Sequence, residues 1–352
     1  MTPRTPRLRR VRRFVPSGRA TKGATPKVVA LGGGMGLSAS LAALRRITRD
    51  LTAVVTVADD GGSSGRLRDE LGVLPPGDLR KALAALCGDD DWGQTWARVI
   101  QHRFQSEGEL HDHAVGNLLI VALWEQLGDH VQALDLVGKL LGAHGRVLPM
   151  SAVPLELQAQ VKGLDKDHPD EISTVRGQAT VALTPGEVQS VHVVPENPPA
   201  VPEAVAAVRD ADWVVLGPGS WFSSVIPHLL VPELREALEE TQARKVLSLN
   251  LAPQPGETEG FSPQRHLEVL ARHAPKLAFD VVLADEAAVP DIDSLTVAAK
   301  QLVGSEVELA AVAARGDDAR SAGGAPDRHD PELLAAAYDR IFRMHGRIGP
   351  WR

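Results

Sequence analysis

Short apolar runs alternate with helical patterns along most of the chain, and this alternation limits the fold more than any other feature. KVVAL (27–31) leads through a glycine loop into a helical pattern at 38–47, and WVVL (213–216) leads through a second glycine loop towards one at 231–241. Strands that alternate with helices pair in parallel, because each helix carries the chain back to the same end of the sheet. The sequence therefore predicts an α/β fold with a mostly parallel sheet.

Two stretches depart from this regular alternation. Further strands are expected at 52–58, 245–251, 279–284 and 307–313, and further helices at 79–87, 203–210, 264–273 and 331–344. Residues from about 79 to 143 are helical throughout, which predicts a helical insertion. Residues 147–195 have short strand patterns broken by Gly and Pro, which predict a small β-rich excursion.

Composition excludes several classes of protein. The 352 residues hold a single cysteine, Cys87, so neither an internal disulfide nor a cysteine-rich metal site can form within one chain, and a reducing cytoplasm is expected. No run approaches the roughly 18 apolar residues of a membrane span. We therefore expect a cytoplasmic protein with no membrane span.

Charge is distributed unevenly along the chain. Residues 1–26 carry eight basic side chains and no acid, so the rest is more acidic than the net charge of −7 suggests. This segment lacks the apolar core of a secretory signal and is expected to be a disordered basic tail. The acidic remainder argues against nucleic acid as the main partner. We expect one domain over 27–345 and a short tail over 346–352.

The first glycine loop, LGGGMGLS, follows the expected strand 27–31 and opens a helix. Gly34-x-Gly36-x-x-Ala39 satisfies the relaxed dinucleotide-binding pattern, in the strand-then-helix context that the pattern requires. Glycines let a backbone approach a ligand closely, and a helix N-terminus offers free N–H groups to an anion. The loop predicts a phosphate site, with a tight structural turn as the alternative.

The second loop, VADDGGSSGRLRDE (57–70), places two aspartates after the next expected strand. Asp59 or Asp60 could bind a ribose, or the two could share a Mg²⁺ ion that bridges phosphates. The following glycines and serines, ending in Arg66, suggest that anionic groups lie on this side as well. A solvated acidic turn is the alternative. Gly61-x-Ser63-x-Gly65 matches the hydrolase nucleophile elbow, but the preceding aspartates disfavour an oxyanion there.

Four later segments add polar side chains at expected loop positions. In PPGDLRK, Asp78 either caps the following helix or contacts ligand, and Arg80 and Lys81 lie in its first turn, where cations oppose the helix dipole unless an anion is near. The others are HDHAVGN with Asn117, GPGS with Gly217, Gly219 and Ser220, and Asn250 before QPGET. Two glycine loops at strand ends of one sheet predict a ligand site more strongly than either loop alone.

Taken in order, GGGxGLS, VADDGGSSGRLR, PPGDLR, HxxGN, GPGS, QPGET and RHDP resemble the YvcK/CofD-like family, and the YvcK branch (the gluconeogenesis factors) more closely. The resemblance covers about 27–345 and implies a Rossmann-like core. It implies nucleotide and phosphate contacts from residues matched one by one to the family motifs. These are Gly33, Gly34, Gly36, Leu37, Asp59, Asp60, Ser63, Ser64, Arg66, Asn117, Gly217, Gly219, Ser220, Asn250 and Arg328.

The resemblance also implies function. It implies that this chain is similar to proteins that bind UDP-sugars, chiefly UDP-N-acetylglucosamine. Those proteins link carbon metabolism to cell-wall precursor supply and cell shape. We therefore expect a UDP-sugar-binding regulator without turnover, acting on a protein partner in cell-wall precursor synthesis and forming a homo-oligomer. The alternatives are a Mg²⁺-dependent CofD-type phospholactyl transferase, with Asp59 and Asp60 on the metal, and an NAD-binding protein.

Overall fold

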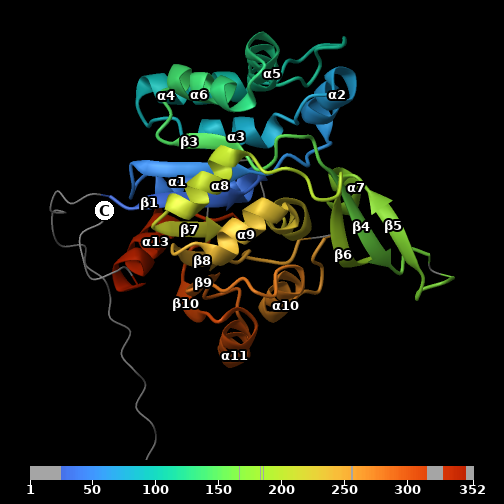
Figure 1. The fold of residues 1–352 in the computed structure, drawn as a ribbon, viewed down its shortest axis with the longest axis vertical. Helices are drawn as coiled ribbons and strands as arrows, with labels where there is room; N and C mark the ends of the chain where they lie inside the picture. The colour runs from blue at the N-terminus through green and yellow to red at the C-terminus, as the bar shows by residue number, and fades with distance from the viewer. Residues whose placement is uncertain are drawn as a thin grey trace, which may run out of the picture.

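The computed structural model describes residues 25–314 and 328–345, except positions 166, 183, 185, 255 and 256. Its centre is a seven-stranded sheet in the order β10-β9-β8-β7-β1-β2-β3, and all six strand pairs are parallel. The strands are β1 Lys27–Gly32, β2 Asp50–Val55, β3 Arg146–Pro149, β7 Trp213–Leu216, β8 Arg244–Ser248, β9 Val281–Asp285 and β10 Glu306–Ala310. The predicted α/β fold with a Rossmann-like parallel sheet is confirmed (Figure 1).

The strand order reverses between β1 and β7. From β1 the chain builds outward through β2 to β3, and it then returns to the other side of β1 and builds outward from β7 to β10. The loops that follow β1 and β7 therefore leave the sheet in opposite directions and leave a crevice between them, which is where open α/β sheets bind their ligands.

Helices surround the sheet on both sides and at both ends (Figure 1). They are α1 Gly34–Leu44, α2 Gly62–Leu71, α3 Gly77–Ala85, α4 Asp91–Gln101, α5 Val115–Leu127, α6 His130–Leu141, α8 Pro202–Asp210, α9 Pro232–Glu240, α10 Pro263–His273, α11 Ile292–Val303 and α13 Pro331–His345. A π-helical turn η1 (Trp221–Val225) and a 3₁₀ turn η2 (Ile226–Leu230) follow β7. The division into one domain with two tails stays a prediction, since both tails lie outside the described residues.

Five helices, α2 to α6, separate β2 from β3, and α3 to α6 lie in the stretch predicted as a helical insertion. β3 itself differs from expectation. The sequence pattern groups residues 147–195 together as a β-rich excursion, but Arg146–Pro149 pairs in parallel with Thr52–Val55 and forms the edge of the main sheet. A four-residue strand that pairs with a segment about 90 residues earlier leaves no local signal of its partner.

The rest of the β-rich excursion is a small antiparallel sheet in the order β5-β4-β6. Its strands are β4 Glu156–Lys162, β5 Ile172–Arg176 and β6 Glu187–Val194, and the short helix α7 (Gln178–Ala182) follows β5. In Figure 1 this sheet projects from one side of the molecule, with α7 on its inner side. The predicted small β-rich excursion is confirmed in this form.

The last helix packs on the central strands as its apolar spacing predicts. Tyr338 and Phe342 of α13 are buried, and the Phe342 ring stacks on that of Trp213 in β7 with centroids 4.4 Å apart. The Tyr338 hydroxyl lies 2.9 Å from the Ser40 hydroxyl of α1. Asp330 caps the helix by accepting the N–H of Leu333 at 3.0 Å. None of the helices in the described part of the chain has the length and apolar character needed to cross a membrane.

Candidate functional site

A cavity of about 440 Å³ opens where the strand order reverses, at the carboxyl ends of β1, β2, β7 and β8. Segments that are far apart in sequence meet there because parallel strands end at the same edge of the sheet. Its lining comprises Gly33, Gly34, Met35, Gly36, Asp59, Asp78, Lys81, Gln178, Pro218, Gly219, Ser220, Ser224, Asn250, Leu251, Ala252, Pro253, Gln254, Arg328 and His329. Eight of the residues predicted from sequence are among them.

The two glycine loops touch each other across this cavity. A Cβ atom on Gly36 would lie 2.3 Å from the carbonyl oxygen of Pro218 and 2.6 Å from the Cα of Gly219. Both atoms belong to the backbone of the other loop, so neither can move aside cheaply. A Cβ on Gly33 would likewise meet Thr56 at 2.5 Å. Gly36 is therefore needed to bring the two backbones together, and Gly33 to bring the start of α1 against the Thr56 side chain.

Asp78 ties the first glycine loop to α3. It is only 4% exposed, and one carboxylate oxygen accepts the N–H of Gly34 at 2.9 Å while the other accepts from Nζ of Lys81 at 2.8 Å. Asp78 thus does not cap its own helix, which was one of the two sequence interpretations, and the other, ligand contact, stays a prediction for a residue that lines the cavity. Its effect is to hold the Lys81 ammonium at the cavity, where Lys81 also lines the wall.

Asp59 is the other carboxylate on the cavity wall. One oxygen accepts the N–H of Gly61 at 3.1 Å, and the Ser64 hydroxyl also donates to the carboxylate. Burial, and then the nearby negative charge of Asp78, raise the pKa of Asp59 above its usual value. A partly buried acid in this position would be stabilised by a cation or by a hydrogen-bond donor on a ligand.

Asp60 points elsewhere. Its carboxylate accepts the N–H of Ala179 in α7 at 2.9 Å, and it does not belong to the described lining of the cavity. The two adjacent aspartates therefore face different partners, and a metal held by Asp59 and Asp60 together stays a hypothesis that the hydrogen bonds do not favour. Of the two, Asp59 is the one beside Asp78 and the ligand-sized space.

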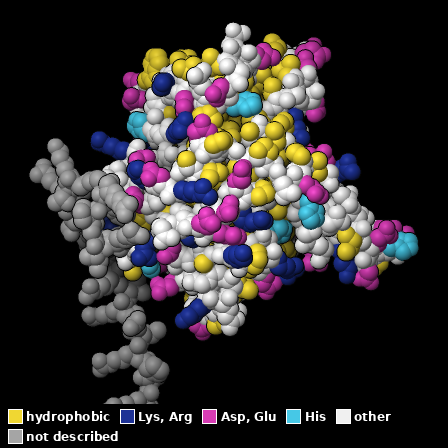
Figure 2. Space-filling view, viewed as in Figure 1, with side chains coloured by type: hydrophobic (Ala, Val, Ile, Leu, Met, Phe, Trp, Pro, Cys, Tyr) yellow, Lys and Arg dark blue, Asp and Glu magenta, His cyan; other side chains and the backbone are white. Residues whose placement is uncertain are grey.

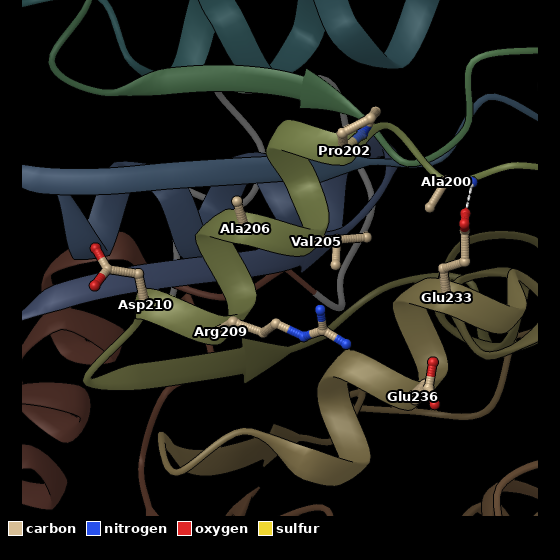
Figure 3. A pocket seen from close by; sticks show the side chains of 8 residues that line it. All are labelled: Ala200, Pro202, Val205, Ala206, Arg209, Asp210, Glu233 and Glu236. Carbon is tan, nitrogen blue, oxygen red and sulfur yellow. Dashed lines mark hydrogen bonds between the residues drawn. The ribbon is translucent and has the colours of Figure 1, made fainter.

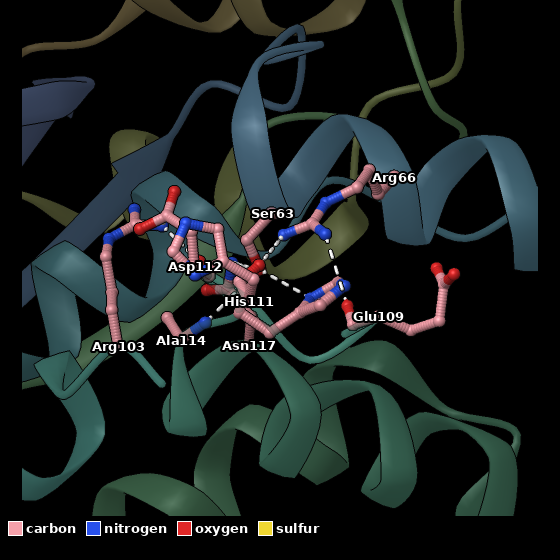
Figure 4. Close-up of polar contacts among 9 residues, drawn as sticks. Ser63, Arg66, Arg103, Glu109, His111, Asp112, Ala114 and Asn117 are labelled. Carbon is pink, nitrogen blue, oxygen red and sulfur yellow. Dashed lines mark hydrogen bonds and ion pairs between the residues drawn. The ribbon is translucent and has the colours of Figure 1, made fainter. Parts of the chain in front are cut away.

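The stretch after Asp60 is a helix and not the open loop that its glycines suggested. α2 begins at Gly62, and Ser63 and Ser64 are 1% and 3% exposed. The Ser63 hydroxyl lies 3.1 Å from Nδ1 of His113 and accepts from the Asn117 amide at 3.0 Å (Figure 4). Ser63 and Asn117 are therefore engaged with each other, away from the described cavity wall.

Arg66 also lies outside the described lining of the cavity. Its guanidinium donates to the carbonyl of His111 at 2.6 Å and to that of Glu109 at 3.3 Å, so it holds the loop before α5 (Figure 4). Neighbouring Arg103 binds Asp112 of the same loop at 3.1 Å. This cluster joins α2 to the helical layer, and Figure 4 shows its members directed towards one another.

The second glycine loop is held by two side chains that follow it in the sequence, Asn250 and Glu257. Asn250 makes two hydrogen bonds to Gly219, accepting its N–H at 2.9 Å and donating to its carbonyl at 2.8 Å. Glu257, 5% exposed, accepts from the hydroxyl of Ser220 and from the N–H groups of Phe222 and Ser223, each at 2.9 Å. The Glu257 carboxylate thus occupies the backbone N–H groups at the start of η1, as Asp78 occupies the N–H of Gly34 at the start of α1.

The remaining predicted residues have distinct places. Leu37 is buried in the core below the first loop, and Gly217, with φ of +77°, offers its carbonyl to the Ser40 hydroxyl at 3.2 Å. Arg328 and His329 line the cavity, beyond strand β10, and burial lowers the pKa of His329 to about 4. His329 is therefore neutral near pH 7, so Arg328 and Lys81 supply the cationic groups of the described lining.

Lys81 and Gln178 line the cavity but are not among the residues that the family motifs predict as ligand contacts. Lys81 had a signal, because a cation in the first turn of a helix is unfavourable unless an anion is near. Gln178 had none, since it comes from α7, between β5 and β6 of the small sheet, and lines the same cavity as Asp59 only in three dimensions.

A larger cavity of about 710 Å³ lies between α8 and α9 (Figure 3). Its wall includes Val205 and Ala206, and Glu233 spans it to accept the N–H of Ala200 at 2.8 Å. It holds no glycine loop and lies away from the strand ends. Apolar side chains and charges of both signs are mixed over this face (Figure 2). The crevice at the strand ends is therefore the better candidate despite its smaller volume.

The sequence profile of the family described as 2-phospho-L-lactate transferase CofD matches residues 28–323. The chain belongs to the CofD family. This confirms the family resemblance inferred from the ordered motifs. The matched range contains both glycine loops and the whole sheet except Lys27, whereas Arg328 and His329 of the cavity lining lie beyond it.

Relatives of this CofD-family member carry gluconeogenesis names. A Mycobacterium tuberculosis H37Rv protein named "Putative gluconeogenesis factor" is 52% identical over 320 residues, covering 90% of each chain. The "Gluconeogenesis factor" of Bacillus subtilis 168 is 37% identical over 269 residues, covering 76% of this chain and 81% of that one. A crystal structure of a UPF0052-family protein from Bacillus halodurans superposes with a TM-score of 0.75 at 32% identity, covering 88% and 98% of the two chains.

Proposed function

We propose that the protein is a regulator that binds a UDP-sugar, in particular UDP-N-acetylglucosamine, in the crevice between β1 and β7. The observation that carries the proposal is the pairing of a glycine loop at a helix start with Lys81, which Asp78 holds at the cavity. Backbone amides and one fixed ammonium suit a diphosphate. Gln178, Asn250 and Arg328 offer the polar groups that a sugar and a base would use.

The regulatory role rests on the gluconeogenesis names of the relatives and on the YvcK-type motifs. We propose that the bound state is passed to a protein partner in cell-wall precursor synthesis, so that growth on gluconeogenic carbon sources is matched to wall supply and cell shape. The protein acts in the cytoplasm and as a homo-oligomer in this proposal.

A second candidate is a Mg²⁺-dependent transferase of the CofD type, which the family profile favours. The raised pKa of the partly buried Asp59 beside Asp78 fits a divalent cation near these two carboxylates. When bound, such a cation would neutralise phosphate charge. The residues of the chain would bind and orient: Asp78 fixes Lys81, and the first glycine loop receives the phosphates.

A thermal-shift panel separates the two candidates. UDP-N-acetylglucosamine, other UDP-sugars, UDP, GDP and NAD are each tested with and without Mg²⁺. A ligand at about 100 times its dissociation constant should stabilise the fold by about 2.7 kcal/mol. We expect UDP-sugars to stabilise without Mg²⁺. Stabilisation by GDP alone, and only with Mg²⁺, would contradict the regulator and support the transferase.

A further inference from the structure

Asp60 joins the main domain to the small antiparallel sheet. It follows β2, yet its carboxylate accepts the N–H of Ala179 in α7, 119 residues further along the chain, at 2.9 Å. Gly177, just before α7, has φ of +89°, and a Cβ there would lie 2.3 Å from the second carboxylate oxygen of Asp60. The backbone of residues 177–179 is thus wrapped closely around this one side chain.

The main-chain side of Asp60 is equally confined. A Cβ on Gly65 of α2 would lie 2.0 Å from the carbonyl oxygen of Asp60. Two glycines, one on each side, are therefore required for Asp60 to fit between α2 and α7. Through this carboxylate, the position of the end of β2 determines the position of the start of α7.

Gln178 lies between the two residues that contact Asp60, and it lines the cavity. The N–H of Gly177 donates to the carbonyl of Leu157 in β4 at 2.8 Å, so the small sheet holds this turn from its other side. Asp60 and the small sheet together fix where the Gln178 side chain stands relative to Asp59, which also lines the cavity.

We infer that Asp60 is a positioning residue, which holds Gln178 so that its carboxamide recognises the hydroxyl- or amide-bearing group attached to the diphosphate. This rests on the proposed function for its ligand. A carboxamide is neutral and can both donate and accept, so it suits a sugar hydroxyl or an N-acetyl group better than a phosphate. Gln178 would then set the preference for the sugar portion, while the glycine loop and Lys81 bind the diphosphate.

Asp60→Asn and Asp60→Ala distinguish positioning from a direct role of the charge. Asparagine keeps an oxygen that can accept the Ala179 N–H, whereas alanine removes it. By calorimetry we expect Asp60→Ala and Gln178→Ala to weaken UDP-N-acetylglucosamine binding about tenfold with little change for UDP. Asp60→Asn and the exposed control Asp69→Ala should bind both ligands as the wild type does. Equal losses in Asp60→Asn and Asp60→Ala would overturn the inference and indicate a metal-binding or other charge-dependent role.

Amide hydrogen exchange without ligand tests the positioning independently of the proposed function. The amides of residues 179–181 should exchange faster in Asp60→Ala and at the wild-type rate in Asp60→Asn and Asp69→Ala. Unchanged exchange in Asp60→Ala would overturn the positioning role. If the wild type binds no UDP-sugar while this exchange pattern holds, the proposed function fails and Asp60 retains only its structural part, which overturns the recognition assigned to Gln178.

Discussion

Replacing Gly36 by alanine is expected to destroy ligand binding and to destabilise the fold. The new methyl group would lie 2.3 Å from the carbonyl oxygen of Pro218 and 2.6 Å from the Cα of Gly219. Because both atoms are backbone, the two glycine loops must separate, and forced separation of packed groups costs about 1–3 kcal/mol. The free energy of unfolding in urea should fall by that amount, and affinity for UDP-N-acetylglucosamine should fall at least about tenfold.

Gly108→Ala is the matched control for this substitution. No atom lies within 4 Å of a Cβ built at Gly108, and its φ is not in the left-handed region. The variant should fold and bind as the wild type does. If Gly36→Ala retained both wild-type stability and wild-type affinity, the two loops would not approach each other closely. The crevice between them would then differ from the one described.

Glu257→Ala is expected to lower stability by about 3 kcal/mol, measured by urea unfolding at pH 7. The buried carboxylate accepts from two backbone amides, those of Phe222 and Ser223, and from the hydroxyl of Ser220. Alanine leaves these buried donors without an acceptor and removes the group that shapes the second glycine loop. Glu257→Gln keeps one acceptor oxygen and should lose less. The exposed Glu259→Ala should stay within about 0.5 kcal/mol of the wild type.

Glu257 also predicts a pH dependence. Burial raises its pKa in the folded protein, although the hydrogen bonds it accepts act in the opposite direction. A raised folded-state pKa means that the native state holds the proton more tightly. The resulting stabilisation is complete below the unfolded pKa and is lost as pH rises through the folded pKa. Glu257→Gln should lack this loss. If the free energy of unfolding changed with pH at the same slope in the wild type and in Glu257→Gln, the raised pKa of Glu257 would be contradicted.

The sheet and the glycine loops could be predicted because their signals are local. An apolar run that leads into Gly33, Gly34 and Gly36 and then into a helix pattern specifies the end of a parallel strand without knowledge of its neighbours. Because the strand order reverses between β1 and β7, this loop meets the loop that contains Gly219. Family motifs then selected eight of the nineteen residues on the cavity wall.

The structure and contacts of residues 60–66 could not be predicted from local sequence patterns. Their small side chains suggest an exposed loop, but Ser63 is buried against His113 and Asn117, about 50 residues away in sequence, and Asp60 is hydrogen-bonded to the N–H of Ala179. These contacts depend on how α5 and the small sheet pack against α2, and a local sequence pattern does not specify that packing. Glu257 was likewise read as part of a loop motif, whereas its burial depends on the position of η1.

Calorimetric titration of matched lysine variants tests most directly the proposal that the crevice between β1 and β7 binds the diphosphate of a UDP-sugar. UDP-N-acetylglucosamine is titrated into the wild type, Lys81→Ala and Lys300→Ala. Lys81 lines the cavity, whereas Lys300 is exposed on α11. We expect the wild type and Lys300→Ala to bind equally and Lys81→Ala to bind about tenfold or more weakly. Absence of wild-type binding, or equal affinity in all three proteins, would contradict the claim.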